Sequence, residues 1–289
     1  MQKSMENKDF AVFILTHGRP DNVITYHTLK TSGYTGDIYI VIDNEDKSAE
    51  KYYENFGDKV IMFDKKAIAK TFDEADNFED RRAIVYARNA CFEIAKDLGI
   101  TYFMQLDDDY SLFDFRINDK GTRPKGHYKI RTKLDKVLDS LLNYYKSINV
   151  QSLAIAQGGD YIGGIGNAFY NYKLRRKCMN TFICSTKRPF QFQGRINEDV
   201  NTYTNQASKG NVFLTTPLLS ITQASTQSSQ GGMTDIYLDK GTYIKSFYSV
   251  IFQPSSVKVA LMGDKNMRLH HRVSWKHTLP VILEEKHKK

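Results

Sequence analysis

Continuous apolar runs alternate with helix-like segments in the first part of this 289-residue chain. Two of the runs, Phe10–Leu15 (FAVFIL) and Ile38–Ile42 (IYIVI), have the length and composition of buried strands. Helices are predicted from Pro20 to Lys30 and from Arg81 to Leu98, and Gly99 is a typical C-terminal signal for the second. Strands that alternate with helices are joined by crossover connections, so the pattern predicts an α/β fold with a mostly parallel sheet.

Further elements follow from the same patterns. Two more helices are predicted at Lys133–Lys146 and Glu198–Gln206, and further strands at Lys59–Phe63, Tyr102–Leu106, Ser152–Gln157, Phe182–Ser185, Val212–Thr215 and Val257–Met262. Long polar loops at Gly158–Asn167 and Gln223–Gly232 are typical of functional lids more than of spacers. No repeat and no clear linker interrupts these segments, so we predict a single domain over residues 1–289.

The overall composition, with 41% apolar and 26% charged residues, is that of an ordinary globular protein. No segment approaches the ~20 apolar residues of a membrane helix, and the N-terminal MQKSMENKDF is too polar for a signal peptide, so we expect no membrane partner. The three cysteines lack metal-site spacing, which favours a reducing cytoplasm. The net charge of +8 suits either a solvated basic surface or a polyanionic partner, nucleic acid first.

Three consecutive aspartates, Asp107, Asp108 and Asp109, directly follow the predicted strand Tyr102–Leu106. Ligands of open parallel sheets bind beyond the carboxyl ends of the strands, so we expect these carboxylates in a crevice. A divalent cation that bridges two phosphates would offset the repulsion between them. The alternative is an ordinary Asp-rich turn. The buried strand and the α/β pattern before it favour the cation site.

Asp107-x-Asp109 after a buried strand resembles the DxD motif of GT-A fold glycosyltransferases. Three further stretches follow the order of that fold: Thr16-His17-Gly18-Arg19-Pro20 after the first strand, Asp43 at the end of the second, and Ala87-Arg88-Asn89 before the aspartates. The resemblance implies a mixed, mostly parallel sheet flanked by helices. It also implies a nucleotide-sugar donor, with a UDP-sugar expected, and a divalent cation, Mn or Mg, as cofactor.

More narrowly, the chain is similar over nearly its whole length to the glycosyltransferases associated with TET/JBP-type DNA dioxygenases. The stretches that carry the similarity are FILTHGRPDNV, YIVIDNEDK, DRRAIVYARNACFEIAKDLG, QLDDDY, RPFQFQGRINEDVNTYT, QGGMTDIYLD and RLHHRVSW. The similarity implies transfer of a sugar to a hydroxymethylated pyrimidine in DNA, such as 5-hydroxymethylcytosine, for a bacterial virus in the cytoplasm of its infected host. It assigns residues 1–115 to a nucleotide-sugar-binding half and residues 116–289 to an acceptor-binding half.

The resemblance also implies roles for single residues on the donor side. The residues expected to contact the nucleotide sugar are Thr16, His17, Arg19, Asp43 and Arg88. Asp109 is the expected metal ligand. Asp107 is expected on the metal, on a metal-bound water or on the ribose. Asp108 points the other way on an extended chain, so it is either at the donor or structural.

Two later clusters complete the implied site. Asp199, with Glu198 beside it, is the expected base for the attacking hydroxyl, because inverting GT-A enzymes place an acidic pair at the start of such a helix. The alternative is a role at the helix N-terminus, where negative charge is stabilised, and a retaining enzyme would need no base. One of His270 and His271 is the expected further metal ligand, and the alternative is a surface pair in a basic segment.

The acceptor side leaves more alternatives open. Lys187–Arg195 (KRPFQFQGR) interleaves cations with aromatic rings, which suits a flipped or unpaired base as well as a β-hairpin with ordinary packing. Arg268, Arg272 and Lys276 suit a diphosphate or a DNA backbone. Two other functions remain open: a GT-A glycosyltransferase with a saccharide or protein acceptor, and a nucleotidyltransferase or nuclease that uses the aspartates for two-metal chemistry.

Overall fold

The computed structural model describes residues 6–75, 80–116, 128–129, 133–161, 176–223, 244–262, 267–278 and 285. The elements of the first part are β1 (Phe10–Leu15), α1 (Ile24–Thr31), β2 (Asp37–Asp43), α2 (Ala49–Phe56), β3 (Val60–Phe63), α3 (Lys65–Ala69), α4 (Val85–Asp97) and β4 (Tyr102–Asp107). They are followed by β5 (Tyr110–Phe115), β6 (Tyr128–Lys129), α5 (Leu134–Ser147), β7 (Ser152–Gln157), β8 (Phe182–Ser185), α6 (Glu198–Ser208) and β9 (Phe213–Gln223). The last elements are α8 (Ile244–Phe252), β10 (Val257–Met262), β11 (Arg268–Val273) and α9 (Trp275–Thr278).

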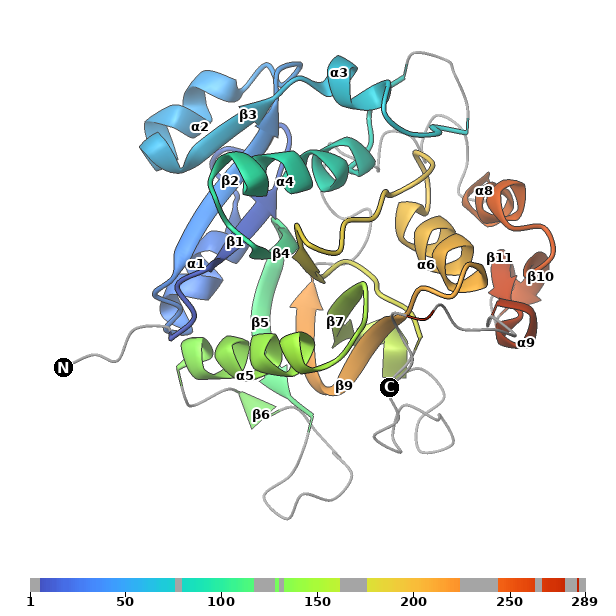
Figure 1. Ribbon diagram of the computed structural model, residues 1–289. Helices are drawn as coiled ribbons and strands as arrows, with labels where there is room; N and C mark the ends of the chain where they lie inside the picture. The colour runs from blue at the N-terminus through green and yellow to red at the C-terminus, as the bar shows by residue number, and fades with distance from the viewer. Residues whose placement is uncertain are drawn as a thin grey trace.

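Nine of these strands form one sheet in the order β3-β2-β1-β4-β8-β7-β9-β5-β6 (Figure 1). Strands β1 to β4 are mutually parallel, and β7 pairs with β9 in parallel. Strands β8 and β5 run against the others, since each forms antiparallel pairs with its neighbours. The predicted mixed, mostly parallel sheet is confirmed. It takes strands from both predicted halves of the chain, and the assignment of those halves to donor and acceptor stays a prediction.

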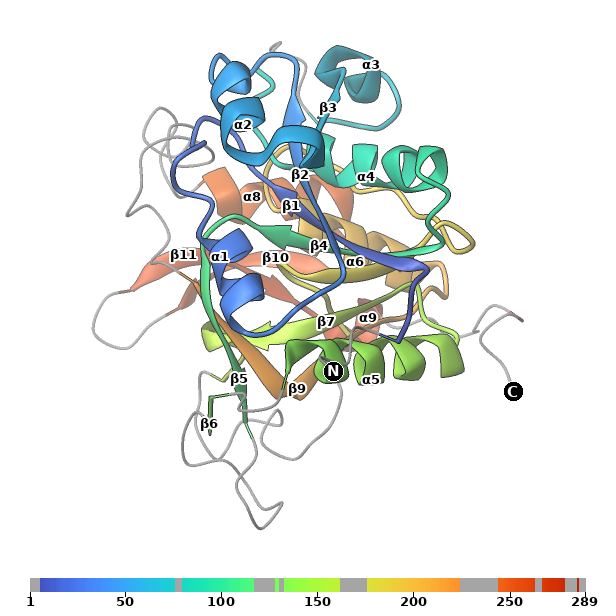
Figure 2. The same cartoon turned by 90° about the vertical axis from the view of Figure 1, so that its left-hand side faces the viewer.

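Both faces of the sheet are covered, and β1 is apolar and buried at every position. In β1, Phe10, Val12 and Ile14 pack with α1 and α5, whereas Ala11 and Phe13 pack with α4 and α6. Figure 2 shows α5 and α4 on opposite sides of the strands. A strand buried on both faces reads as a continuous hydrophobic run, which is why FAVFIL was recognisable without alternation.

Parallel register brings three polar strand ends to one edge of the sheet. Leu15 of β1 is paired with Val41 of β2 on one side and with Asp107 of β4 on the other. Thr16, Asp43 and Asp107 therefore lie at neighbouring carboxyl ends. This is the edge at which open parallel sheets bind ligands.

Several element boundaries differ from the sequence prediction. The strand predicted over Val212–Thr215 is longer in the structure, because β9 continues to Gln223, past Pro217 and a register shift opposite β7. Helix α1 begins at Ile24, four residues after Pro20. Helices α2, α3, α8 and α9 and strands β5, β6 and β11 were not predicted.

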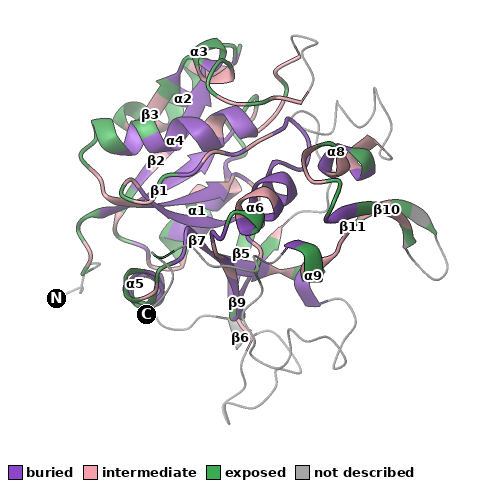
Figure 3. Ribbon diagram, turned by 45° about the vertical axis from the view of Figure 1, so that its right-hand side comes forward, coloured by how far each residue is buried: buried purple, intermediate pink, exposed green. Residues whose placement is uncertain are grey.

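The last part of the chain forms a separate two-stranded sheet. Strands β10 and β11 pair antiparallel and contact α8, which in turn contacts α6 (Figure 3). Trp275, the first residue of α9, is half-buried and its ring stacks on that of Tyr203 of α6, with centroids 5.8 Å apart and planes at 15°. This ribbon is thereby fixed to α6.

Two further observations concern the cysteines and the length of the helices. Cys91, Cys178 and Cys184 are all buried and unpaired with one another. Among the described residues, no helix has both the length and the apolar character needed to cross a membrane.

Asn89 provides a test of how α4 is tied to the segment before α6. Its side chain donates to the Phe192 carbonyl (3.0 Å) and accepts from the Phe192 amide (2.8 Å), and both residues are buried. We expect Asn89→Ala to lower the free energy of unfolding by about 2 to 4 kcal/mol, because two buried backbone groups lose their partners. Urea unfolding followed by circular dichroism measures the change.

Asn55→Ala is the matched control, because the Asn55 amide donates to the Pro20 carbonyl at an exposed position. It should change the free energy of unfolding by less than about 0.5 kcal/mol. Equal effects of the two substitutions would contradict the role given to Asn89.

Candidate active site

Asp107, Asp108 and Asp109 form the turn from β4 to β5, which we call the aspartate corner. Thr25 of α1 fixes the backbone of this corner. The Thr25 hydroxyl donates to the Asp107 carbonyl (2.6 Å) and accepts from the Tyr110 amide (2.9 Å), while its own amide donates to the Asp108 carbonyl (3.0 Å). With its backbone fixed in this way, the corner presents three carboxylates in three different directions.

Asp108 faces the turn that follows β1. Its carboxylate accepts from the Thr16 hydroxyl (2.7 Å) and from Arg19 Nη1 (3.2 Å), and the residue is 6% exposed. Burial raises the pKa of Asp108, against the opposing effect of these two donors. These contacts favour the structural alternative for Asp108, since they use it to hold the turn.

Asp109 keeps an oxygen without a partner. Its Oδ1 is buried and accepts no hydrogen bond from the described residues, whereas its carboxylate interacts with Gln223 at the end of β9. Burial, followed by the charge of Asp108, raises the pKa of Asp109. Because an unsatisfied buried carboxylate oxygen is costly, this atom marks a position that a cation would satisfy.

Arg88 connects the aspartate corner to α6. It is 1% exposed, its Nη2 donates to Asp107 Oδ1 (3.0 Å) and its Nε donates to Glu198 Oε1 (2.9 Å). The guanidinium lies over the Phe182 ring, 4.8 Å from its centroid, and Nη1 has no hydrogen-bond partner among the described residues. Burial raises the pKa of Asp107 to about 7, although Arg88 lowers it.

The turn after β1 is tied to β2 and the residues that follow it. His17 Nδ1 lies 2.8 Å from Asp43 Oδ2, and buried Lys65 donates to the same oxygen (3.2 Å). Burial raises the pKa of Asp43, but His17 and Lys65 outweigh it, so the pKa lies below the ordinary value. Gly18, at φ +69°, donates its amide to Asp46 (2.7 Å).

Sequence reasoning missed Lys65, Asp46 and Tyr52 in this cluster. The Tyr52 hydroxyl accepts from the Arg19 amide (2.8 Å) and lies 2.9 Å from the Thr16 hydroxyl. The sequence signal for two of these residues was their position, because Asp46 follows shortly after β2 and Lys65 shortly after β3, at the same sheet edge.

The acidic pair lies at the first turn of α6, as predicted, but its two members differ. Glu198 is engaged by Arg88, whereas Asp199 accepts from the Val200 amide (2.7 Å) within its own turn. Burial, followed by the charge of Glu198, raises the pKa of Asp199 above its ordinary value. The residue before them, Asn197, adopts a left-handed conformation (φ +55°, ψ +40°) and makes no side-chain cap.

The histidines lie beside this helix start. Asn197 Nδ2 donates to His271 Nδ1 (3.4 Å), and burial lowers the pKa of His271 to about 3, so its ring is neutral. His270 Nδ1 contacts the His271 carbonyl (2.7 Å). In the described parts of the chain, no three His, Cys, Asp or Glu side chains gather as a metal site, so the predicted ligands, Asp107, Asp109 and one of His270 and His271, are not brought together in this structure.

The segment expected to receive a base is packed into the protein. Phe190 and Phe192 are buried among the rings of the α4–α6 side of the sheet, and buried Arg195 pairs with Asp80 (3.5 Å). The base-stacking alternative for Lys187–Arg195 is therefore wrong for these rings, and no β-hairpin forms there. Gly158–Tyr161 is a 3-10 helix, and the rest of the two predicted lids, 162–167 and 224–232, lies outside the described residues.

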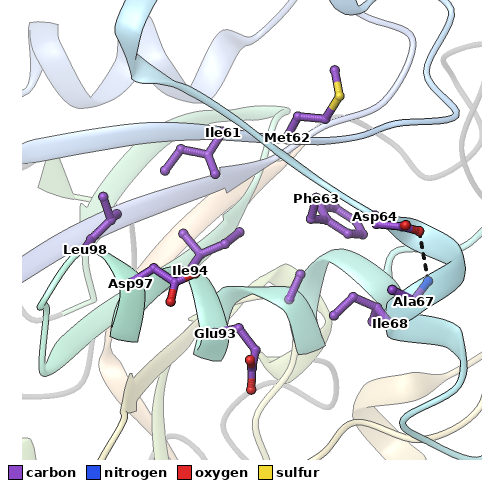
Figure 4. Close-up of a pocket in the computed structure, with 11 residues that line it drawn as sticks. Ile61, Met62, Phe63, Asp64, Ala67, Ile68, Glu93, Ile94, Asp97 and Leu98 are labelled. Atoms are coloured by element: carbon purple, nitrogen blue, oxygen red, sulfur yellow. Dashed lines mark hydrogen bonds between the residues drawn. The ribbon is translucent and has the colours of Figure 1, made fainter.

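A hollow of about 350 Å³ lies between β3, α3 and α4 (Figure 4). It is lined mainly by apolar side chains such as Ile61, Ile68 and Ile94, with Glu93 and Asp97 among the lining residues. None of its lining residues is a lysine or arginine. A nucleoside diphosphate therefore has no cationic partner in this hollow. The candidate site remains the polar edge of the sheet, at Thr16, Asp43 and Asp107.

A model of the family described as TET-Associated Glycosyltransferase matches residues 10–232, well over half of the chain and including the whole of the polar edge. The chain belongs to the TET-associated glycosyltransferase family. The predicted family is confirmed, and with it the predicted enzyme class, a glycosyltransferase. No curated protein matches the chain significantly.

Solved structures similar to this member of the family are distant. Residues 1–349 of TarS from S. aureus share 12% identity, with 75% of this chain and 61% of that chain covered and a TM-score of 0.41. Glucosyl-3-phosphoglycerate synthase from Mycobacterium tuberculosis, solved with Mg²⁺ and uridine diphosphate, shares 8% identity, with 92% and 90% covered and a TM-score of 0.45. The chain thus spans less than two thirds of the TarS fragment, and similarity at this level transfers no substrate.

Replacing Arg88 tests whether its charge holds the corner together. Arg88→Met leaves Asp107 and Glu198 buried without their cation, and we expect a loss of about 3 to 5 kcal/mol in the free energy of unfolding at about pH 8. The pKa of folded Asp107 already lies above its unfolded value and rises further without Arg88. The folded variant therefore binds a proton that the unfolded chain releases, and the loss should shrink at about pH 5.5.

Arg81→Met is the matched control, because it removes a more exposed pair with Glu45. Its effect should stay below about 1 kcal/mol at both pH values. Urea unfolding at the two pH values measures both variants, and a loss for Arg88→Met that grows toward low pH would refute the electrostatic role.

Proposed function

We propose that the protein transfers a sugar from a UDP-sugar to the hydroxymethyl group of a modified pyrimidine in DNA, such as 5-hydroxymethylcytosine. The observation that carries the donor side is the aspartate corner, at the carboxyl ends of parallel strands, where buried Asp109 Oδ1 has no partner in the described part of the chain. Family membership supports glycosyl transfer over the nucleotidyltransferase and nuclease alternatives.

Asp109 and Asp107 are the residues proposed to hold a divalent cation, Mn or Mg. Magnesium is commonly bound through one or two carboxylates together with substrate phosphates, so a ready-made cluster of three protein ligands is not required. The orphaned Asp109 oxygen fits such a hard cation. When bound, the cation would stabilise the negative charge on the departing diphosphate. We do not include His270 or His271 in this set, because among the described residues no three His, Cys, Asp or Glu side chains gather as a metal site.

Arg88 and the turn after β1 are proposed to hold the rest of the donor. Arg88 Nη1, which donates to none of the described residues, is a buried cationic donor next to Asp107 and suits a diphosphate oxygen. His17 and Asp43 lie where the nucleoside would bind, and their mutual contact pre-orients both groups. Thr16 and Arg19 contribute through Asp108, by fixing the shape of this turn.

Asp199 is the proposed general base. In an inverting transfer its carboxylate takes the proton of the acceptor hydroxyl, the hydroxyl oxygen bonds to the sugar carbon, and the bond from that carbon to the diphosphate oxygen breaks. Burial raises the pKa of Asp199 toward the range of an effective base. Glu198 is better suited to position Arg88, since it accepts from the guanidinium.

DNA is the proposed acceptor, and the proposed setting is the cytoplasm of an infected bacterial cell. The net charge of +8 and the description of the family support a polyanionic, DNA-linked acceptor. A saccharide or protein acceptor would be indicated instead if sugar transfer required no nucleic acid.

Asp109→Asn tests the donor site. Wild-type protein incubated with UDP-sugars, Mn and duplex DNA containing 5-hydroxymethylcytosine should produce nucleosides that mass spectrometry detects at increased mass. The variant should lose at least roughly 100-fold in kcat/KM, because a cation supplies several kcal/mol of charge stabilisation. It should also lose Mn-dependent UDP binding in calorimetry.

Asp37→Asn is the matched control, since Asp37 is an exposed carboxylate at the opposite end of β2. It should leave both measurements unchanged. No mass gain with any donor would reject the proposed function, and full activity of Asp109→Asn would reject the metal assignment.

The acidic pair is tested by comparing Asp199→Asn with Glu198→Gln. Asp199→Asn should lose about 10²- to 10⁴-fold in kcat while retaining affinity for UDP and Mn, because it removes only the proton acceptor. Glu198→Gln should lose less activity but also stability, because Arg88 loses a charged partner. The reverse order of kcat values, or a product with retained anomeric configuration by NMR, would overturn the assignment of the base.

A further inference from the structure

The β10–β11 ribbon has two chemically distinct faces. Residues directly opposite each other in an antiparallel pair share a face, and the register pairs Lys258 with Arg272 and Val259 with His271. The face with Val259 and His271 points toward α6 and α8, since His271 contacts Asn197 and the neighbouring Val257 is fully buried. The opposite face carries Lys258 and Arg272, both exposed.

The outer face places like charges directly against each other. Cross-strand pairs of like charge are destabilising, and neither Lys258 nor Arg272 forms an ion pair with any described residue. Lys276 follows on α9 and is exposed as well. The sequence between residues 244 and 278 is strongly cationic, with one acidic residue, Asp264, against Lys245, Lys258, Lys265, Arg268, Arg272 and Lys276. Folding alone gives no reason for this pairing, whereas an anionic partner would offset its cost.

The ribbon is anchored to the helix that carries the proposed base. His271 of β11 accepts from Asn197, the residue before Glu198 and Asp199, and Trp275 stacks on Tyr203 of the same helix. Figure 3 shows β10 and β11 extending away from α6 beside α8. The ribbon also lies outside the residues matched by the family model, which end at 232.

We propose that the outer face of the β10–β11 ribbon, defined by Lys258, Arg272 and the adjacent Lys276, is the docking surface for duplex DNA. This inference rests on the proposed function and identifies the element that holds its acceptor. Cations that neutralise phosphates release condensed counterions and so drive association. A two-stranded β-ribbon fits the major groove, about 12 Å wide, where the 5-substituent of a pyrimidine also lies.

The test compares two charge-reversal variants of the full chain. Lys258→Glu/Arg272→Glu alters the ribbon, and Lys30→Glu/Lys136→Glu makes the same charge change at exposed positions of α1 and α5, on the other side of the sheet. Fluorescence anisotropy measures binding to a duplex of roughly 30 bp over a salt series. The ribbon variant should bind at least roughly tenfold more weakly at ~0.15 M salt, and its salt slope should fall by about two.

A second measurement separates this inference from the proposed function. Transfer to the isolated nucleoside 5-hydroxymethyldeoxycytidine does not need the ribbon, so the ribbon variant should match wild type there and lose kcat/KM only on duplex DNA. Absence of transfer by wild type would reject the proposed function, while the binding comparison would still decide the role of the ribbon. A third variant, Lys258→Gln/Arg272→Gln, removes the two charges without reversing them, and we expect it to lose less DNA affinity. Urea unfolding of each variant shows whether a folding defect, and not the lost charge, weakens binding.

Two outcomes would overturn the proposal. One is equal duplex affinity of the ribbon and control variants. The other is a ribbon variant that loses binding to phosphatidylglycerol vesicles but keeps its affinity for DNA, which would make the ribbon a membrane-docking surface.

Discussion

The buried guanidinium of Arg88 is the interaction on which the rest of the site depends. A cation that is 1% exposed is tolerable only when carboxylates and polarisable rings surround it, and here Asp107 and Glu198 supply the charges while Phe182 lies beneath the plane. These partners come from β4, α6 and β8, which are far apart in the chain. One side chain of α4 thereby fixes the distance between the aspartate corner and the acidic start of α6.

Hydrogen bonds distinguish the carboxylates that fix the backbone of the site from Asp109, which is proposed to bind a ligand. Asp46 and Asp108 are used by the turn after β1, and Asp43 is shared by His17 and Lys65. Asp109 retains a buried oxygen that has no partner among the described residues. The three consecutive aspartates therefore have different contacts: Asp107 pairs with Arg88, Asp108 fixes a turn, and Asp109 is the one proposed to bind a ligand. Mutual repulsion is lowered because the corner turns the three side chains apart.

Local sequence patterns predicted the central strands of the sheet, but they missed or shortened other strands. FAVFIL and the apolar centre of SLAIAQ were recognised because strands buried on both faces carry near-continuous apolar runs. The predicted strand ended at Thr215, whereas β9 continues past Pro217 through a register shift opposite β7. Strand β11 was missed because RLHHRV carries four cationic or titratable residues, and its strand conformation depends on pairing with β10 and packing on α8.

The sequence by itself determined the α/β class, the polar residues at the ends of β1, β2 and β4, and the family, because these depend on local apolar runs and on motifs with fixed order. Only the tertiary structure decided which carboxylate binds which donor, since Arg88 and Glu198 are separated by 110 positions and meet through packing. The same holds for Phe190 and Phe192, whose aromatic character suited a nucleobase as well as a core. Burial among other rings placed them in the core, and no local pattern specifies burial at such sequence separations.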